Sequence, residues 1–278
     1  MKTLTDKVVV ITGAASGIGR APAVDIARRG AHLALSDVDA HGLAATVRLA
    51  KQAGATRCTP GRLDVADREA FAAYAIDVDD QFGRVNVVIN NAGVALSGDP
   101  ADLSYEDMDW IVGINFWGVV HGTKEFLPYL IASGDGHVVN ISSLFGLVSM
   151  PSQSAYNATK YAVRGLTEAV REEMLVAGHR VGVTSVHPGG IKTAIARNAR
   201  VSDAEDKEAT SAFFDQRLAS MSPEKAAEII VKGILRNRAR VLVGLDAHVL
   251  HHFARLTGSR YRDVVAPVSK RVLPGKAV

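Results

Sequence analysis

The sequence predicts an α/β fold in which a parallel β-sheet is covered by helices on both faces. Short runs of β-branched residues alternate along the chain with longer amphipathic segments, a rhythm typical of strands joined by helical crossovers. These runs are continuously apolar, as expected of strands that are buried on both faces. No repeat, low-complexity segment or interdomain linker interrupts the pattern. We therefore expect a single doubly wound domain.

The elements can be assigned in order along the chain. A run of valine and isoleucine at 7–12 predicts the first strand, and a glycine cluster precedes a helix at 17–29. Gly178 ends a later helix. The other expected strands are 31–36, 56–63, 85–90, 137–142, 181–187 and 241–244. The other expected helices are 40–53, 67–82, 104–131, 154–177 and 223–237.

Charge is concentrated at the end of the chain. The net charge is +3, but residues 244–278 hold six Lys/Arg and two Asp, so the rest is close to neutral. No basic stripe with interleaved aromatic residues occurs in the body, which argues against nucleic-acid binding. We expect a domain at 1–244 and a basic C-terminal extension at 245–278, built of a docked helix and a tail. The polar stretch 197–211 suggests a mobile substrate lid within about 194–222.

Cysteine content and hydropathy bear on location. The one cysteine, Cys58, excludes an internal disulfide and agrees with a reducing compartment. No apolar run reaches the ~18 residues of a membrane span. The sequence thus predicts a cytoplasmic protein without an integral membrane segment.

A glycine-rich turn follows the first strand. Residues 12–19 read TGAASGIG, with the spacing G-x-x-x-G-x-G. Glycines at a strand-to-helix turn let a ligand approach the backbone, and the helix N-terminus offers free N–H groups to a pyrophosphate. A glycine cluster alone also fits an ordinary tight turn, but its place between a buried strand and a helix favours a dinucleotide site.

The second strand ends in an acidic residue, Asp37. Its carboxylate can accept hydrogen bonds from both hydroxyls of an adenosine ribose and would repel a 2′-phosphate, which favours NAD over NADP. Neither Ser16 nor Ser36 offers the basic group that a 2′-phosphate would need. The alternative role of Asp37 is to cap the next helix, for which Asp39 competes. Asp64 follows the third strand and can meet the adenine.

Tyr156 and Lys160 are four residues apart and share one face of an expected helix. A phenol is a weak acid at neutral pH, and a neighbouring cation is expected to lower its pKa. The pair alone is common in helices. Ser143, at the end of a strand 13 residues earlier, strengthens the interpretation, because ligands of open α/β sheets bind beyond the carboxyl ends of the strands.

With these motifs in place, the sequence resembles the short-chain dehydrogenase/reductase family from about residue 7 to 244. The resemblance implies a Rossmann-type sheet of about seven strands in the order 3-2-1-4-5-6-7 and an NAD(P)-dependent oxidoreductase. It rests on motifs whose order and spacing fit jointly. They are Thr12-Gly13…Gly17-Ile18-Gly19, Asp64-Val65, Asn90-Asn91-Ala92-Gly93, Asn115, Ser143, Tyr156…Lys160 and Pro188-Gly189…Thr193.

The resemblance also implies roles for single residues. Tyr156 exchanges a proton with the substrate oxygen, Ser143 positions that oxygen, Lys160 binds the nicotinamide ribose, and Asn115 holds a water of a proton relay. Ile191 and Thr193 fix the carboxamide. The residues expected to bind the cofactor are Gly13, Ser16, Gly17, Ile18, Gly19, Asp37, Asp64, Val65, Asn91, Ala92, Gly93, Tyr156, Lys160, Pro188, Gly189, Ile191 and Thr193.

The expected substrate lining is mostly apolar. It suggests that the substrate is a hydrophobic secondary alcohol or ketone, sterol-like or acyl-derived. NAD(H) would exchange a hydride with it. An NADP-preferring carbonyl reductase is the alternative, and a non-catalytic, cofactor-sensing protein of the same fold is a third interpretation. The expected lining residues are Val94, Leu96, Leu144, Phe145, Gln153, Ile195, Phe213 and Phe214.

The C-terminal extension and the longest helices suggest further contacts. Leu245, Val249, Phe253 and Leu256 recur at helical spacing, which fits a helix docked on the body or another subunit; contact with an anionic surface or acidic substrate carrier is the alternative. Helices 104–131 and 154–177 fit the pair through which relatives form dimers and tetramers. No metal is expected, and the nearby histidines fit a partly exposed helix face: His248, His251 and His252.

Overall fold

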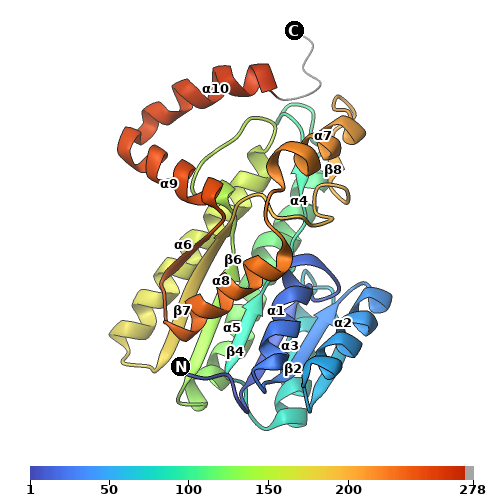
Figure 1. Cartoon of the computed structure of the whole chain (residues 1–278), viewed down its shortest axis with the longest axis vertical. Coiled ribbons are helices and arrows are strands. Elements are labelled where there is room, and N and C mark those ends of the chain that lie inside the picture. Colours follow the sequence, from blue (N-terminus) through green and yellow to red (C-terminus); the bar gives the residue numbers. More distant parts are fainter. Residues whose placement is uncertain (273–278) are drawn as a thin grey trace.

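The computed structural model describes residues 1–272 and contains a seven-stranded sheet in which all neighbouring strands run parallel (Figure 1). The strand order is β3-β2-β1-β4-β6-β7-β9. This confirms the predicted fold class and order. The strands are β1 (Val8–Thr12), β2 (His32–Asp37), β3 (Cys58–Arg62), β4 (Val87–Asn90), β6 (Gly136–Ile141), β7 (Val181–Pro188) and β9 (Arg240–Val243).

Helices cover both faces of the sheet and enclose two apolar layers. Along β1, Val9 and Ile11 pack on one side while Val8 and Val10 pack on the other, because successive side chains of a strand point to opposite faces. One layer lies under α1 (Gly17–Arg28), α2 (Ala40–Ala53) and α8 (Pro223–Leu235). The other lies under α3 (Arg68–Phe82), α5 (Gly118–Ala132) and α6 (Ser154–Val176).

Five of the α-helices begin at a side chain that accepts a hydrogen bond from the first turn. Asp39 accepts from the amide of Gly42 at the start of α2, and Asp67 accepts from that of Ala70 at the start of α3. Ser222 does the same for α8, where Pro223 occupies the first helical position. These caps set the residue at which each helix begins, and so they fix the length of the loop that precedes it.

The helix expected at 104–131 is interrupted. It comprises α4 (Tyr105–Val112), a π-helical turn at Gly113–Trp117, and α5. Within the turn, the Asn115 amide group donates to the carbonyl of Val94 at 2.9 Å and accepts from its N–H at 2.8 Å. This long-range pairing draws Asn115 inward and accounts for the extra residue in the turn.

The expected lid segment is attached to the body through several contacts, and residues at its end, Ser220 and Met221, donate backbone hydrogen bonds to the carbonyl of Gly190. Within the segment, β8 (Arg200–Val201) pairs with β5 (Leu96–Ser97) in a separate two-stranded sheet, and α7 (Lys207–Phe213) follows. The guanidinium of Arg200 lies 4.0 Å from the centre of the Trp110 ring and 3.0 Å from an Asp107 carboxylate oxygen. The mobility of this segment stays a prediction.

The C-terminal extension forms α9 (Leu245–Thr257) and α10 (Tyr261–Val272), which lie at the top of the molecule in Figure 1. Ala247 and Phe253 pack on the body, but Leu245, Val249 and Leu256 are 78%, 56% and 87% exposed. The predicted stripe therefore does not dock as a unit, because the face of α9 turned to the body is shifted. The end of the basic tail, 273–278, lies outside the described residues. Over residues 1–272, no helix has both the length and the apolar character needed to cross a bilayer.

Candidate active site

The glycines of the turn after β1 are packed too closely against neighbouring residues to carry side chains. Gly13 has φ +65°, and a Cβ there would lie 2.7 Å from the Cα of Ala92. Gly17 has φ +50°, and its Cβ would lie 3.0 Å from Cγ2 of Thr193. Ser16 precedes α1 but its side chain does not cap the helix. The uncapped N–H groups and the bare backbone fit the pyrophosphate of a dinucleotide.

Hydrogen bonds hold the end of β4 against this turn. The Thr12 hydroxyl accepts from the amides of Asn91 and Ala92, each at 3.1 Å. The Asn91 side chain donates to the carbonyls of Thr12 and Gly13 at 2.9 and 3.0 Å. The structure thus brings together two motifs that lie almost 80 residues apart in the sequence.

Asp37 and Asp39 have different roles. Asp39 caps α2, whereas the Asp37 carboxylate accepts from the amides of Ala15 at 2.8 Å and of Asp39 at 2.9 Å. Asp37 is therefore not the cap of α2, but a half-buried carboxylate that joins the end of β2 to the glycine turn. Asp64 is exposed, with its carboxylate accepting from the Ala66 amide, and Val65 beside it is buried.

Tyr156 and Lys160 lie on α6 and face the residues that follow β6. The Ser143 side chain lies near the Tyr156 hydroxyl and lowers its pKa. The Lys160 ammonium donates to the carbonyl of Ile141 at 3.1 Å and lies 5.6 Å from the centre of the Tyr156 ring. Ser142 donates to the Lys160 carbonyl at 2.8 Å, which fixes α6 on the end of β6.

Burial dominates the protonation of this pair. It raises the pKa of Tyr156 above its ordinary value, opposed by the nearby Ser143 side chain, and lowers the pKa of Lys160 to about 8. The expectation that the ammonium lowers the pKa of the phenol is therefore not met in the protein chain alone. The physical reason is that both groups lose hydration, since Tyr156 and Lys160 are 9% and 3% exposed.

Asn115 lies close to the lysine. A Cβ on Gly93 would be 3.2 Å from the side-chain oxygen of Asn115 and 3.3 Å from Nζ of Lys160, so both groups border Gly93. Asn115 also donates to the hydroxyl of Thr159 at 3.3 Å. Asn115, Ser143, Tyr156 and Lys160 therefore meet at one place.

The loop after β7 completes this end of the sheet. Ile191 is buried, and Thr193 packs against Gly17 as described above. The amide of Gly190 donates to the Asp246 carboxylate at 2.7 Å, so the first turn of α9 holds the loop. The segment that follows Pro188 and Gly189 thus lies beside the glycine turn, where a bound dinucleotide would extend.

His187 and Asp246 were not predicted as site residues. Nδ1–H of His187 donates to the Ser143 carbonyl at 2.8 Å, and its Nε2 accepts from the Ser185 hydroxyl at 2.9 Å. Burial lowers the pKa of His187 to about 4, so the ring is neutral. The sequence alone indicates a packing residue at the end of a strand for His187, and its place directly before Pro188 was the available signal. For Asp246, the signal was an acidic residue in the first turn of a helix that follows a strand.

The predicted substrate lining divides into three parts. Val94, Leu96 and Phe145 pack in one apolar cluster with Tyr156, and the rings of Phe145 and Tyr156 meet edge to face. Gln153 donates to Ser97 at the border of this cluster. Leu144 instead packs with residues of the C-terminal extension. The remaining three are half-buried and their contact with substrate stays a prediction: Ile195, Phe213 and Phe214.

Within the described part of the chain, no three His, Cys, Asp or Glu side chains converge as a metal site would require. His248 and His252 stack with ring centres 6.4 Å apart on α9.

Comparison with known proteins agrees with this geometry. Residues 7–204 match the short chain dehydrogenase family. The chain is 56% identical over 274 residues to a putative oxidoreductase, SadH, of Mycobacterium tuberculosis, covering 99% of both chains. It is 34% identical to a C alpha-dehydrogenase of a Sphingobium species, covering 89% of this chain and 86% of that protein.

A solved structure of similar size shares the fold. A short-chain dehydrogenase/reductase of Burkholderia phymatum in complex with NAD superposes with a TM-score of 0.82 at 33% identity, covering 100% of this chain and 99% of the other. The sequence match, the sheet order and the convergence of Ser143, Tyr156 and Lys160 support one conclusion. This chain belongs to the short-chain dehydrogenase/reductase family of oxidoreductases.

Proposed function

We propose that the protein transfers a hydride between NAD(H) and a secondary alcohol or ketone, with Tyr156 as the acid/base. The observation that carries this proposal is the position of Tyr156, with the Lys160 ammonium 5.6 Å from its ring centre and Ser143 nearby, beside an apolar cluster on the same sheet end as the glycine turn. A nicotinamide, when bound, supplies the hydride acceptor or donor, and the protein supplies orientation and proton transfer.

The roles of the side chains follow from their positions. Ser143 holds the substrate oxygen within reach of Tyr156, which takes the proton during oxidation and returns it during reduction. Lys160 holds ribose hydroxyls and is the cation beside the phenol. Asn115, fixed through Val94, carries a water that connects Lys160 with solvent. His187 fixes the backbone of Ser143, so the serine hydroxyl is positioned before substrate arrives.

Preference for NAD is the part of the proposal that rests on Asp37. A 2′-phosphate beside this carboxylate would be repelled. Arg20, in the first turn of α1, donates to the carbonyls of Ala15 and Gly42, which supports the view that it braces the turn rather than meeting a phosphate. The Burkholderia relative contains NAD, whereas an alcohol dehydrogenase of Thermococcus sibiricus at 28% identity contains 5-hydroxy-NADP. NADP preference is the alternative.

The apolar cluster around Tyr156 favours a hydrophobic substrate. The test is a series of secondary alcohols of increasing apolar bulk, incubated with NAD and followed by NADH absorbance. We expect turnover to improve with bulk, since a buried CH₂ group contributes ~0.8 kcal/mol. Absence of turnover with all alcohols and with the matching ketones and NADH would favour a cofactor-sensing role.

We further propose a homo-oligomer, either a dimer or a tetramer. Support comes from an apolar groove of about 280 Å³ between α5 and α6, lined among others by Leu127, Pro128, Ile131 and Leu166. Sedimentation of the protein and of a Leu127→Glu variant tests this, and the variant is expected to lose subunits. A cytoplasmic location stays a prediction that cell fractionation can check.

A further inference from the structure

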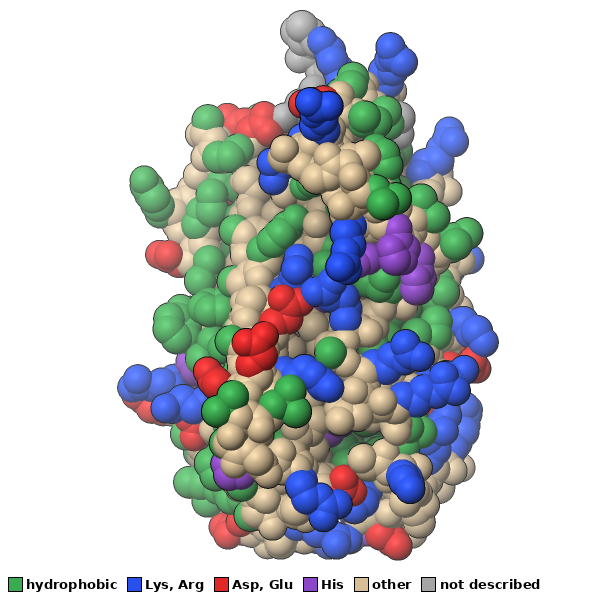
Figure 2. Space-filling view, turned by 90° about the vertical axis from the view of Figure 1, so that its left-hand side faces the viewer, with side chains coloured by type: hydrophobic (Ala, Val, Ile, Leu, Met, Phe, Trp, Pro, Cys, Tyr) green, Lys and Arg blue, Asp and Glu red, His purple; other side chains and the backbone are tan. Residues whose placement is uncertain are grey.

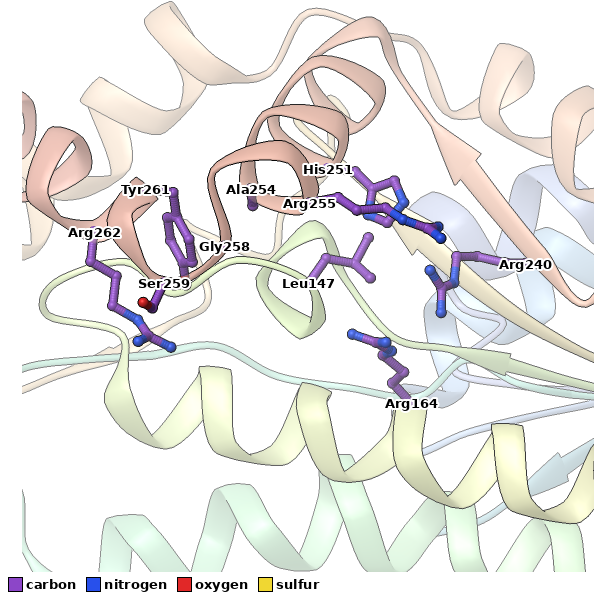
Figure 3. Close-up of a pocket in the computed structure, with 10 residues that line it drawn as sticks. All are labelled: Leu147, Arg164, Arg240, His251, Ala254, Arg255, Gly258, Ser259, Tyr261 and Arg262. Carbon is purple, nitrogen blue, oxygen red and sulfur yellow. The ribbon is translucent and has the colours of Figure 1, made fainter.

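A second cavity, of about 540 Å³, lies between α6 and the C-terminal extension. Figure 3 shows Arg164 reaching into it from α6 below, while His251 and Arg255 reach from α9 toward Arg240. Arg262 points down at the other end of the cavity. Ser259 and Tyr261 add hydroxyl groups. Four guanidinium groups in all thus line the cavity, some on the body and some on the C-terminal extension.

One carboxylate offsets this positive charge. Glu168 accepts from Arg164 at 3.1 Å and also pairs with Arg240. Among residues 1–272, no carboxylate lies within ion-pair distance of Arg255 or Arg262. Figure 2 shows Lys and Arg side chains gathered in the middle of this face, next to a group of His side chains. The four guanidinium groups carry more positive charge than the one carboxylate neutralises, so the pocket can bind a further anion.

The pKa of His251 is also affected by the excess of positive charge. Burial lowers its pKa, and the nearby Arg240, His252, Arg255 and Arg164 add to the effect. A neutral imidazole can donate one hydrogen bond without adding to the repulsion among the arginines. Glu168, on α6, pairs with Arg164, one of these arginines.

We propose that this pocket binds an anion carrying two or more phosphoryl groups, such as a diphosphate. Guanidinium groups form paired hydrogen bonds with phosphate oxygens, and Arg164 and Arg240 are already held in place by Glu168. The volume falls within the range of small-molecule sites. Because the pocket is a recess between two helices, a small anion can enter it more readily than the surface of an acidic protein can.

The pocket shares a wall with the loop that follows Ser143. Leu147 lines it, and the Tyr261 hydroxyl accepts from the amide of Ser149 at 2.9 Å. Tyr261 also packs with Leu144 and Val148. An anion held by Arg164 and Arg240 on the body and by Arg255 and Arg262 on the extension would fasten the extension onto this loop. The phosphates could belong to a carrier attached to the substrate or to a free anion, and both have the same chemistry.

The test is calorimetric titration of inorganic pyrophosphate into protein that is saturated with NADH, so that the glycine turn is occupied. We expect one site per chain and a rise in melting temperature of about 5 °C at saturation. Arg255→Gln should weaken binding by about tenfold or more. Arg260→Gln is the matched control, because Arg260 is exposed on the same extension and does not line the pocket. It should bind as the wild type does.

Three outcomes would overturn the proposal. They are absence of pyrophosphate binding at low ionic strength, equal loss in both variants, and tighter binding of poly-glutamate than of pyrophosphate with the same dependence on Arg255. None of them requires turnover, so they do not depend on the proposed reaction; failure of NADH to saturate the protein would count against the proposed function and not against this pocket.

Two further measurements separate the sources of the phosphate. If a carrier bears it, adenosine 3′,5′-bisphosphate should inhibit competitively against a substrate thioester of coenzyme A, and Arg255→Gln should raise KM for that thioester alone. If a free anion binds, pyrophosphate should shift the melting temperature without competing with any substrate. Either result supports the pocket as a phosphate site.

Discussion

The carboxylate of Asp246 accepts a hydrogen bond from the backbone amide of Gly190 at 2.7 Å. Asp246 begins the C-terminal extension, whereas Gly190 belongs to the loop after β7 that approaches the glycine turn. A Cβ on Gly189 would lie 2.1 Å from the same carboxylate, so only a bare backbone can pass there. The extension is therefore part of the support of the cofactor site.

Removal of this acceptor should weaken cofactor binding. Asp246→Ala leaves the Gly190 amide without its partner, a loss of about 1–3 kcal/mol. We expect NADH affinity, measured by fluorescence titration, to fall by about tenfold. Asp246→Asn keeps an acceptor oxygen and should recover most of the affinity. If Asp246→Ala and Asp246→Asn lower NADH affinity equally, the charge of Asp246 rather than its hydrogen bond holds the loop.

Loss of the Tyr156 hydroxyl should abolish proton transfer and leave the cofactor bound. Tyr156→Phe keeps the ring that packs edge to face with Phe145, so the fold should be unchanged. We expect turnover to fall by more than a hundredfold with NADH affinity retained, because general acid–base catalysis contributes ~10²–10⁴-fold. Near-normal turnover in this variant would falsify the assignment of Tyr156 as the acid/base.

The strands and the placement of Tyr156 beside Lys160 could be predicted because their signals are local. Buried parallel strands such as Val8–Thr12 are continuous apolar runs, and Tyr156 and Lys160 are one helical turn apart. The π-helical turn could not be predicted, since it depends on the pairing of Asn115 with Val94 across the fold. Gly113 and Gly118 at its borders were the only local sign.

The supporting residues could not be found because their partners are remote in sequence. His187 contacts Ser143, 44 residues away, and Asp246 contacts Gly190, 56 residues away. The sign of the pKa shift of Tyr156 was missed for the same reason. Burial is a property of the assembled fold, and it raises the pKa of Tyr156 more than Ser143 lowers it.

Lys160 should make the protein more stable as pH rises from about 8 to about 10.5. Burial lowers its pKa to about 8 in the folded chain, so in this range the unfolded chain binds more protons than the native one. The gain amounts to about 3 kcal/mol of unfolding free energy. Urea unfolding of the wild type and of Lys160→Met across this range checks it. The variant should lack this rise in unfolding free energy. Parallel pH profiles of the two proteins would contradict the lowered pKa of the buried Lys160 amine.

His187 should destabilise the protein in acid. Its pKa is about 4 in the folded chain against an ordinary 6.5, so the unfolded chain takes up a proton first as pH falls between these values. We expect a loss of about 3 kcal/mol of unfolding free energy over this window. His187→Asn keeps a donor toward Ser143 and should give a flatter profile with turnover nearly intact. His187→Leu should flatten the profile but also lower turnover.

Asp37 should decide between NAD and NADP through its charge. Asp37→Asn keeps an oxygen that can accept from the Ala15 amide, so the glycine turn should hold its shape while the repulsion of a 2′-phosphate disappears. We expect NADPH affinity to rise by about tenfold and NADH affinity to fall, both measured by fluorescence titration. Asp39→Asn is the matched control, because it removes the same charge two residues away and asparagine still caps α2. An equal change of the NADPH-to-NADH ratio in both variants would mean that general surface charge, and not the position of Asp37, sets the preference.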